Sequence, residues 1–548
     1  MTRTAHPDTF ARDRLPPKAQ WPDLNFDLPE LRYPERLNAA AELLDTHVAA
    51  GRGDRTAIWM PVDGRPVAAT YAQLQYRVNQ IARVLVEDLG LVPGNRVLLR
   101  GPNNAMMAAS WLAVMKAGLV AVGTMPLLRA KELQQVIDRA QISHALCDAA
   151  LWQEIANCTN PNGDHYCPTL ERICYFNDGE SGSLEDMMAG KRGEFTAVDT
   201  AAEDVALIAF TSGTTGVPKG TVHFHRDVLA MCDCFPRSCL GLVADDVICG
   251  TPPLAFTFGL GGMLAFPLRV GAATVLTEKN TPDSLLATIA QFKATVCFTA
   301  PTFYRQMAEL AKAHDLRTLT RCVSAGEALP DATRQHFKSA TGIELIDGIG
   351  ATEMIHIFIS HTPATVRRGA TGYAIPGYRA KVIDENGRDC PPGVVGRLAV
   401  QGPTGCRYLD DERQKIYVQD GWNVTGDAYS MDADGYFFYA ARADDMIITA
   451  GYNVAGPEVE SSLLAHPAVA ECGVVGLADP ERGQIVKAFV VLKPGFNASA
   501  KLARILQDHV KADIAPYKYP RAVEFVAALP RTETGKLQRF RLRQAAAA

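Results

Sequence analysis

The segment 211–220 has the residue types of a phosphate-binding loop. It reads Thr-Ser-Gly-Thr-Thr-Gly-Val-Pro-Lys-Gly. Its glycines let the backbone turn tightly and bring N–H groups against an anion, its hydroxyls add donors, and Lys219 adds a mobile positive charge. The P-loop pattern is not met, because Pro218 and Gly220 stand where that pattern requires Gly and Ser or Thr. Taken alone, the segment predicts either a polyphosphate cradle or a glycine-rich surface hairpin.

Four further segments with chemically active side chains follow in a fixed order. They are Ile349–Glu353, Thr425–Asp427, Arg442–Asp445 and Pro530–Lys536. They contribute carboxylates, a threonine, an arginine and a lysine, which are groups that neutralise and position phosphates. One such segment would leave the function open, whereas the ordered set is far more specific.

Buried strands and amphipathic helices alternate around these segments. An apolar run at 205–210 and an extended piece at 221–224 place the first loop between two strands. Repeated strand–helix units imply mainly parallel sheets covered by helices on both faces, with ligands at the carboxyl ends of the strands. The segment 325–327 also directly follows a predicted strand, at 322–324.

The pattern changes in the last third of the chain. From 372 to 439, short strands with turn signals predict a small β-rich unit, which contains Thr425–Asp427. After a break near residues 442–445, about 100 residues suffice for a separate small α+β domain. The sequence therefore predicts an α/β protein with two domains. The N-terminal domain, 1–443, has doubly wound sheets plus the β-rich unit, and the C-terminal domain spans 444–548.

The composition is that of an ordinary soluble globular protein. The 548 residues are 47% hydrophobic and 21% charged, with a net charge of −5, which gives no electrostatic reason to expect nucleic acid or an anionic membrane as a partner. An apolar N-terminal signal and an uninterrupted apolar stretch of ~18 residues are both missing from the sequence. We therefore expect a cytoplasmic protein without a membrane partner, either a monomer or a homodimer.

With these five segments, the chain resembles the adenylate-forming superfamily of acyl-CoA synthetases, luciferases and peptide-synthetase adenylation domains. The resemblance covers essentially the whole chain. It implies that ATP activates a carboxylate as an acyl-adenylate, because a free carboxylate would have to expel oxide, and that coenzyme A then takes the acyl group. Catalysis of this kind depends mostly on positioning and charge neutralisation.

The resemblance also implies residue roles. Lys536, Thr352 and Arg442 would be catalytic, and Glu353 would coordinate Mg²⁺. The segment Thr211–Lys219 would hold the β- and γ-phosphates, and Asp427 would bind the ribose. The implied nucleotide-binding set is Thr211, Ser212, Gly213, Thr214, Thr215, Gly216, Lys219, Ala325, Gly326, Glu327, Gly350, Thr352, Asp427, Arg442 and Lys536.

Thioester formation requires a second site geometry in this superfamily. The C-terminal domain rotates about a hinge, which Asp444 matches. The rotation removes Lys536 and brings Gly451 and Tyr452 toward the pantetheine of coenzyme A. One position departs from the usual pattern, because Ile448 stands where many members have Lys.

The acid site has features of the benzoate-CoA ligase subgroup. Phe256 stands where many relatives have His, and Ile349 stands where most have an aromatic residue. A compact apolar site suits a flat aryl acid, and His356 would supply a polar contact. Other segments look most similar to the 2-aminobenzoate-CoA ligases. The predicted acid-binding set is Phe256, Thr257, Phe258, Ile349, Ala351 and His356.

Two alternatives remain open. The enzyme could load its aryl group onto the thiol of a separate carrier protein instead of coenzyme A. It could also be a non-catalytic nucleotide-binding relative, although Lys536, Glu353 and Asp427 are all intact.

Overall fold

The computed structural model describes most of the chain. Described are residues 3–211, 217–442, 445–449, 452–479, 482–514, 516–531 and 537–547, with the backbone alone at Ile448, Tyr452, Asn453 and Ala547. Several predicted site residues lie outside the described residues, namely Ser212, Gly213, Thr214, Thr215, Gly216, Asp444, Gly451 and Lys536.

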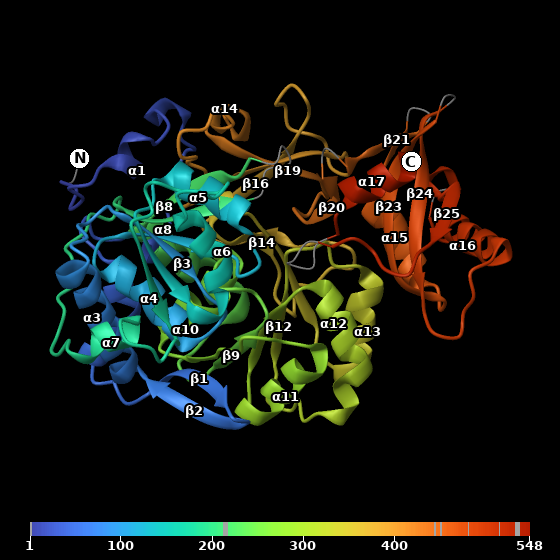
Figure 1. The fold of residues 1–548 in the computed structure, drawn as a ribbon. Coiled ribbons are helices and arrows are strands. Elements are labelled where there is room, and N and C mark those ends of the chain that lie inside the picture. Colours follow the sequence, from blue (N-terminus) through green and yellow to red (C-terminus); the bar gives the residue numbers. More distant parts are fainter. Residues whose placement is uncertain are drawn as a thin grey trace.

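A six-stranded sheet contains the two strands that flank the predicted phosphate loop (Figure 1). Its order is β6–β5–β3–β4–β7–β8, and its neighbours are parallel except β7 and β8. All residues of β3 are buried, as expected for a strand covered on both faces. The strands are β3 (Arg96–Arg100), β4 (Val120–Thr124), β5 (His144–Asp148), β6 (Arg172–Phe176), β7 (Val205–Thr211) and β8 (Lys219–Phe224).

A nine-stranded sheet lies beside it, in the order β15–β14–β13–β12–β11–β9–β10–β1–β2. Its central strands are parallel, and antiparallel pairs close both ends. The strands are β1 (Thr56–Val62), β2 (Arg65–Thr70), β9 (Val247–Gly250), β10 (Ala273–Val275), β11 (Val296–Thr299), β12 (Arg321–Ser324), β13 (Leu345–Gly350), β14 (Ile357–Ser360) and β15 (Tyr373–Ala374).

Helices cover these sheets, as predicted. Helix α4 (Ala105–Lys116) begins where the Asn104 side chain accepts a hydrogen bond from the N–H of Met107, and every residue in the helix is buried. The other helices of this part are α1 (Phe10–Asp13), α2 (Thr46–Ala49), α3 (Tyr71–Arg83), α5 (Ala130–Ala140), α6 (Trp152–Ala156), α7 (Leu184–Ala189), α8 (His225–Phe235), α9 (Thr257–Gly259), α10 (Phe266–Val270), α11 (Pro282–Phe292), α12 (Pro301–Leu310), α13 (Asp331–Thr341) and α14 (Gln414–Tyr417).

The predicted β-rich unit is a five-stranded antiparallel sheet. A segment near the N-terminus contacts this sheet: the N–H of Asp23 donates to the carbonyl of Gly421, and Leu24 forms a β-bridge with Gly402. The strands are β16 (Arg379–Ile383), β17 (Gly396–Gln401), β18 (Val418–Gln419), β19 (Trp422–Met431) and β20 (Phe437–Arg442).

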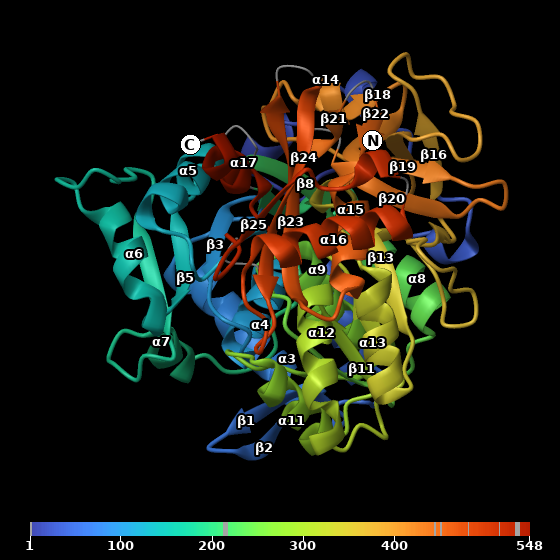
Figure 2. The ribbon, with the colours of Figure 1, turned by 90° about the vertical axis from the view of Figure 1, so that its right-hand side faces the viewer.

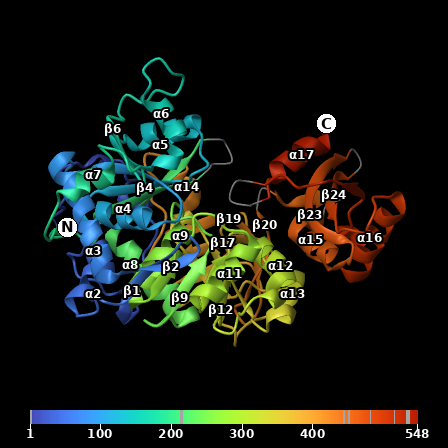
Figure 3. The same cartoon turned by 60° about the horizontal axis from the view of Figure 1, so that its bottom comes forward.

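The C-terminal unit has its own sheet and core and lies beside α12 and α13 (Figures 2 and 3). Arg305 on α12 donates to the carbonyl of Val469 across the interface at 3.5 Å. In the part of the chain that the structure describes, no helix is both long and apolar enough to cross a bilayer. The unit contains β21 (Ile447–Thr449), β22 (Tyr452–Val454), α15 (Gly456–Ala465), β23 (Val469–Asp479), β24 (Gly483–Leu492), α16 (Ala500–Asp513), β25 (Ala522–Phe525) and α17 (Arg539–Ala547).

Candidate active site

The β7–β8 hairpin places Lys219 beside a carboxylate. Thr211, the last residue of β7, pairs with Lys219, the first residue of β8. The Lys219 ammonium donates to Oε1 of Glu353 at 3.3 Å and to the hydroxyl oxygen of Tyr408 at 2.9 Å. Lys219 and Glu353, which are 134 positions apart in the sequence, therefore meet as the predicted site requires.

A short 3-10 turn, Thr352–Met354, carries Glu353 directly after β13. The Glu353 residue is only 7% exposed, and the hydroxyl of Tyr408 donates to its Oε1 at 2.5 Å. The carbonyl of Thr352 accepts a hydrogen bond from Nε2 of His223 on β8 at 2.8 Å. Side chains and backbone thus both join the turn to the hairpin.

The predicted adenine segment, 325–327, follows β12. Gly326 has a φ of +89°, which residues with a Cβ rarely adopt. The carboxylate of Glu327 accepts hydrogen bonds from the hydroxyl of Thr302 at 2.8 Å and from the guanidinium of Arg531 at 3.3 Å. Because Arg531 belongs to the C-terminal unit, the two units meet at this predicted slot.

Asp427 lies within β19 and not in a turn. It pairs in register with Arg442 on β20, and Oδ1 of Asp427 lies 3.4 Å from Nη1 of Arg442. A Cβ on Gly426 would lie 2.5 Å from Nη2 of Arg442, so a glycine leaves room for the guanidinium. The structure therefore brings together two residues that were predicted for ribose binding and catalysis.

His356 lies in a buried cluster of aromatic rings. It is 3% exposed, and its ring centroid is 4.5 Å from that of Phe266, 5.6 Å from that of Phe258 and 5.8 Å from that of Phe235. Nε2 lies 3.4 Å from the carbonyl oxygen of Phe258, whereas Nδ1 has no hydrogen-bond partner among the described residues. Phe258 and His356 of the predicted acid site are therefore neighbours.

Close backbone approaches hold His356 in place. Ile355 has a φ of +64°, a conformation rare for a β-branched residue and one that costs on the order of 1–3 kcal/mol. A Cβ on Gly350 would lie 2.7 Å from the carbonyl oxygen of His356, and a Cβ on Gly261 would lie 2.4 Å from its Cδ2. Glycine at both positions lets the chain pack closely against this histidine.

The other predicted acid-site residues lie on nearby elements. Phe256 precedes α9, in which Thr257 is buried. Ile349 and Ala351 flank the end of β13 and pack, partly buried, against the main core. Their contact with an acid stays a prediction.

Known proteins match the chain over nearly its whole length. A family model described as "AMP-binding enzyme" matches residues 45–407, and one described as "AMP-binding enzyme C-terminal domain" matches residues 458–536. The chain belongs to the AMP-binding enzyme family. The prediction of an adenylate-forming superfamily member is confirmed.

Two relatives of this AMP-binding enzyme are aryl-CoA ligases. The benzoate–CoA ligase of Thauera aromatica is 37% identical over 524 residues, covering 94% of this chain and 98% of the relative. The 3-hydroxybenzoate–CoA ligase of Aromatoleum sp. (strain CIB) is 32% identical, and the match covers 93% of this chain and 97% of the relative. Together with the family match, these relatives confirm the prediction of an AMP-forming acid–thiol ligase.

Solved structures share the fold. An anthranilate CoA ligase in complex with anthranoyl-AMP has a TM-score of 0.88 at 36% identity and covers 95% of this chain and 99% of its own. A benzoate CoA ligase from Burkholderia xenovorans LB400 has a TM-score of 0.84 at 32% identity and covers 92% and 100%. The predicted architecture of a large N-terminal and a small C-terminal domain is confirmed.

Sequence patterns did not indicate two residues that contact the predicted site of the AMP-binding enzyme. Tyr408 touches Lys219 although the two are 189 positions apart, and no spacing rule connects such distant residues. His223 reads as one polar residue within a strand, and only the fold shows that it donates to the carbonyl of Thr352. The sequence offered a signal only for His223, which lies close to the segment 211–220, and none for Tyr408.

Burial keeps His356 of the AMP-binding enzyme neutral. Desolvation lowers its pKa to about 3, although the contact with the Phe258 carbonyl opposes this shift. The unfolded histidine binds a proton below pH ~6.5, so the stability gained from neutral His356 is full above that pH and is lost as pH falls toward the folded pKa. We expect the free energy of unfolding, measured with urea, to fall between about pH 7.5 and about pH 5, and to fall less in His356→Leu. Equal losses in both proteins would contradict this prediction.

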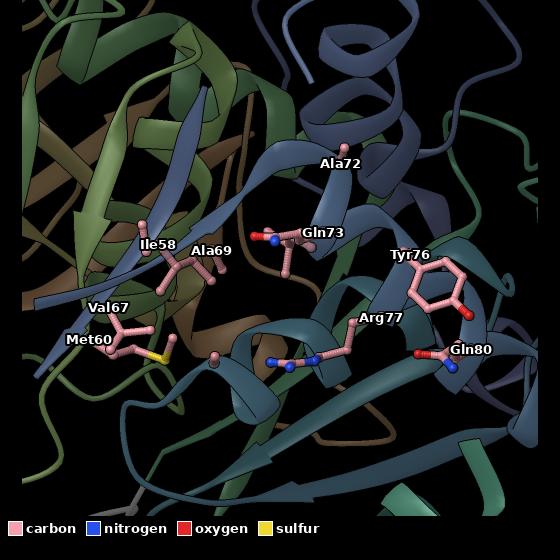
Figure 4. A pocket seen from close by; sticks show the side chains of 12 residues that line it. Ile58, Met60, Val67, Ala69, Ala72, Gln73, Tyr76, Arg77 and Gln80 are labelled. Atoms are coloured by element: carbon pink, nitrogen blue, oxygen red, sulfur yellow. The ribbon is translucent and has the colours of Figure 1, made fainter. Parts of the chain in front are cut away.

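A separate cavity lies away from these residues of the AMP-binding enzyme. It has a volume of about 600 Å³ and lies between the β1–β2 hairpin and α3. Arg77 extends from α3 toward Met60 and Val67 of the hairpin (Figure 4). None of the predicted site residues that the structure describes lines this cavity. The cavity is therefore distinct from the site built around Lys219 and Glu353.

Proposed function

We propose that this protein is an ATP-dependent aryl-CoA ligase. It activates benzoate or a substituted benzoate as an aryl-adenylate and then forms the CoA thioester, with release of pyrophosphate and AMP. The observation that carries the proposal is the buried ring cluster around His356, which follows Glu353 closely in the chain, together with a Lys219–Glu353 pair suited to polyphosphate. Benzoate- and anthranilate-activating relatives support it.

The first half-reaction joins two anions, so the site must neutralise charge. Lys219 supplies an ammonium at the end of the hairpin, 22% exposed, and can donate to phosphate oxygens. Thr352, whose backbone is fixed by His223, is proposed to reach the α-phosphate. Lys536 is proposed to bridge the carboxylate and the α-phosphate as charge moves between them.

Magnesium fits the groups that the structure describes. Oε1 of Glu353 takes both the Lys219 and the Tyr408 contacts, and Oε2 takes no hydrogen bond from the described residues. No cluster of three or more metal-ligating side chains occurs in the described part of the chain. Mg²⁺ is commonly held by one or two carboxylates together with substrate phosphates and water, and it would supply positive charge to those phosphates. Glu353 would be its ligand.

The nucleoside and thiol sites complete the proposal. Asp427 and Arg442 lie together on β19 and β20 and are proposed to bind the ribose and phosphate. The segment 325–327 is proposed to line the adenine slot. Asp444 is proposed as the hinge that exchanges Lys536 for Gly451 and Tyr452 before coenzyme A attacks. Adenylate formation would then take place in one arrangement of the two domains, and the attack of coenzyme A on the same adenylate would take place in the other.

We further propose 2-aminobenzoate as a preferred acid. A carbonyl can only accept, so the contact with Phe258 makes Nε2 of His356 the protonated nitrogen and leaves Nδ1 as an acceptor. Nδ1 is buried without a partner among the described residues. An amino group on the substrate ring could donate to it, and a buried acceptor that is left unpaired costs about 1–3 kcal/mol.

A panel of carboxylic acids tests both the assignment of an aryl acid as substrate and the preference for 2-aminobenzoate. We expect benzoate, 2-aminobenzoate and 3-hydroxybenzoate to support ATP–pyrophosphate exchange and CoA thioester formation. The ratio of kcat/KM for 2-aminobenzoate over benzoate should fall roughly tenfold in His356→Leu, because one hydrogen bond is lost. If only aliphatic or α-amino acids react, the aryl assignment is wrong. If His356→Leu leaves the ratio unchanged, the role of Nδ1 is wrong.

A further inference from the structure

Residues 407–409 form an additional edge on the six-stranded sheet, next to β8. Tyr408 bridges Thr221 in antiparallel fashion, and the N–H of Val222 donates to the carbonyl of Arg407 at 2.8 Å. The N–H of Leu409 donates to the carbonyl of Gly220 at 2.8 Å. The terminal strand of this sheet is thus extended by a piece of chain that leads out of the β-rich unit, and Tyr408 is fixed beside Lys219.

The hydroxyl of Tyr408 connects the two charged groups of the predicted phosphate site. It donates to Oε1 of Glu353 at 2.5 Å and accepts from Nζ of Lys219 at 2.9 Å. An ionised carboxylate can only accept and an ammonium can only donate, whereas a hydroxyl can do both at once. Tyr408 is therefore chemically suited to hold both side chains at the same time.

The surroundings keep this hydroxyl in place. Tyr408 is 1% exposed. Its ring packs edge to face against that of Tyr417 at 5.8 Å, and the Lys219 ammonium lies 5.0 Å from its centroid. A further hydrogen bond joins the chain after this segment to the hairpin: the guanidinium of Arg413 donates to the carbonyl of Val217 at 3.2 Å.

We propose that Tyr408 is a positioning residue for metal-bound ATP. By holding Oε1 of Glu353 and the ammonium of Lys219, its hydroxyl leaves Oε2 of Glu353 for a divalent cation and keeps Lys219 available to the phosphates. Lys219 and Glu353 already form an ion pair at 3.3 Å, and without the hydroxyl that both of them contact, this pair tightens and occupies both groups. The inference rests on the proposed use of Mg²⁺ with ATP.

Calorimetric titration of Tyr408→Phe with ATP tests this role without any turnover. In the presence of Mg²⁺, we expect ATP to bind roughly ten- to a hundredfold more weakly than to the wild type, because a hydrogen bond to a charged group is lost. With EDTA in place of Mg²⁺, the loss should be smaller. The Mg²⁺ midpoint of pyrophosphate exchange should rise in parallel.

Tyr417→Phe is the matched control. Its hydroxyl is buried without a hydrogen-bond partner among the described residues, and its ring packs against Tyr408. This variant should leave the Mg²⁺ dependence of ATP binding unchanged. Thermal unfolding of both variants reports whether each one folds.

Combining Tyr408→Phe with Glu353→Gln separates positioning from packing. If Tyr408 acts through Glu353, the two effects on Mg²⁺-dependent binding will be far from additive. Additive effects, or equal losses with Mg²⁺ and with EDTA, would overturn the inference. If wild-type ATP binding does not depend on Mg²⁺ at all, the proposed metal role fails instead, and the two failures are thereby distinguished.

Discussion

Lys536→Ala is expected to slow aryl-adenylate formation by about 10²–10³-fold, the loss typical when one preorganised donor to developing charge is removed. ATP–pyrophosphate exchange with benzoate measures this step. A supplied aryl-adenylate should still be converted to the CoA thioester at close to the wild-type rate, because the second half-reaction is proposed to use the rotated domain. The effect is large because the proposed lysine bridges the two reacting anions.

Arg531 supports this assignment from the described residues. It lies five positions before Lys536 and pairs with Glu327 of the predicted adenine slot at 3.3 Å and with Glu471 of its own unit at 2.8 Å. Lys501→Ala, at an exposed position on α16, is the matched control and should leave both half-reactions unchanged. Equal loss of both half-reactions in Lys536→Ala would argue against domain rotation.

Asp227→Asn is expected to destabilise the protein by about 3–5 kcal/mol, because it leaves a buried guanidinium without its counter-charge. Asp227 and Arg407 are both fully buried and lie 2.8 Å apart. Burial opposes ionisation of Asp227, yet Arg407 and His223 hold its pKa below the ordinary value. Urea unfolding at neutral pH measures the loss in free energy.

A surface ion pair provides the comparison. Glu203 pairs with Arg226 at 2.7 Å while about half exposed, at 49%. Glu203→Gln should therefore cost no more than about 1 kcal/mol. If Asp227→Asn costs as little, the buried pair is not the stabilising contact that its geometry indicates. Because Asp227 lies beside His223, Asp227→Asn should also weaken the hydrogen bond from His223 to the carbonyl of Thr352.

The spacing of apolar residues predicted helices and strands well where burial alone determines that spacing. The segment 105–116, which is apolar except for Ser110 and Lys116, predicts a helix over these residues, and α4 has these bounds. Thr211 and Lys219, which flank the centre of the predicted phosphate loop, pair in the β7–β8 hairpin as expected, and Ser212–Gly216 lie outside the described residues. The amphipathic pattern over 71–89 predicts one long helix, whereas α3 ends at Arg83 and the chain continues as a π-helical turn, Val84–Asp88.

Contacts between distant segments were beyond the reach of sequence patterns. Gly426 is a residue type common in turns, yet the segment 425–427 lies in strand β19, because β19 pairs with β17 and β20. The contact of Tyr408 with Glu353 and the ring cluster around His356 depend on how separate elements pack. The sequence motifs identified Lys219 and Glu353, whereas only the fold shows that Tyr408 contacts both of them.

The strand-like edge at residues 407–409 also bears on how the protein is made. Lys219 leaves the ribosome 189 residues before Tyr408, an interval of roughly 10–40 s at ordinary rates of synthesis. During that time β8 has an unpaired edge, and such edges invite pairing with other chains. The phosphate site can therefore mature only after the β-rich unit has been synthesised, so nascent chains that end before it should bind ATP poorly and depend most on chaperones.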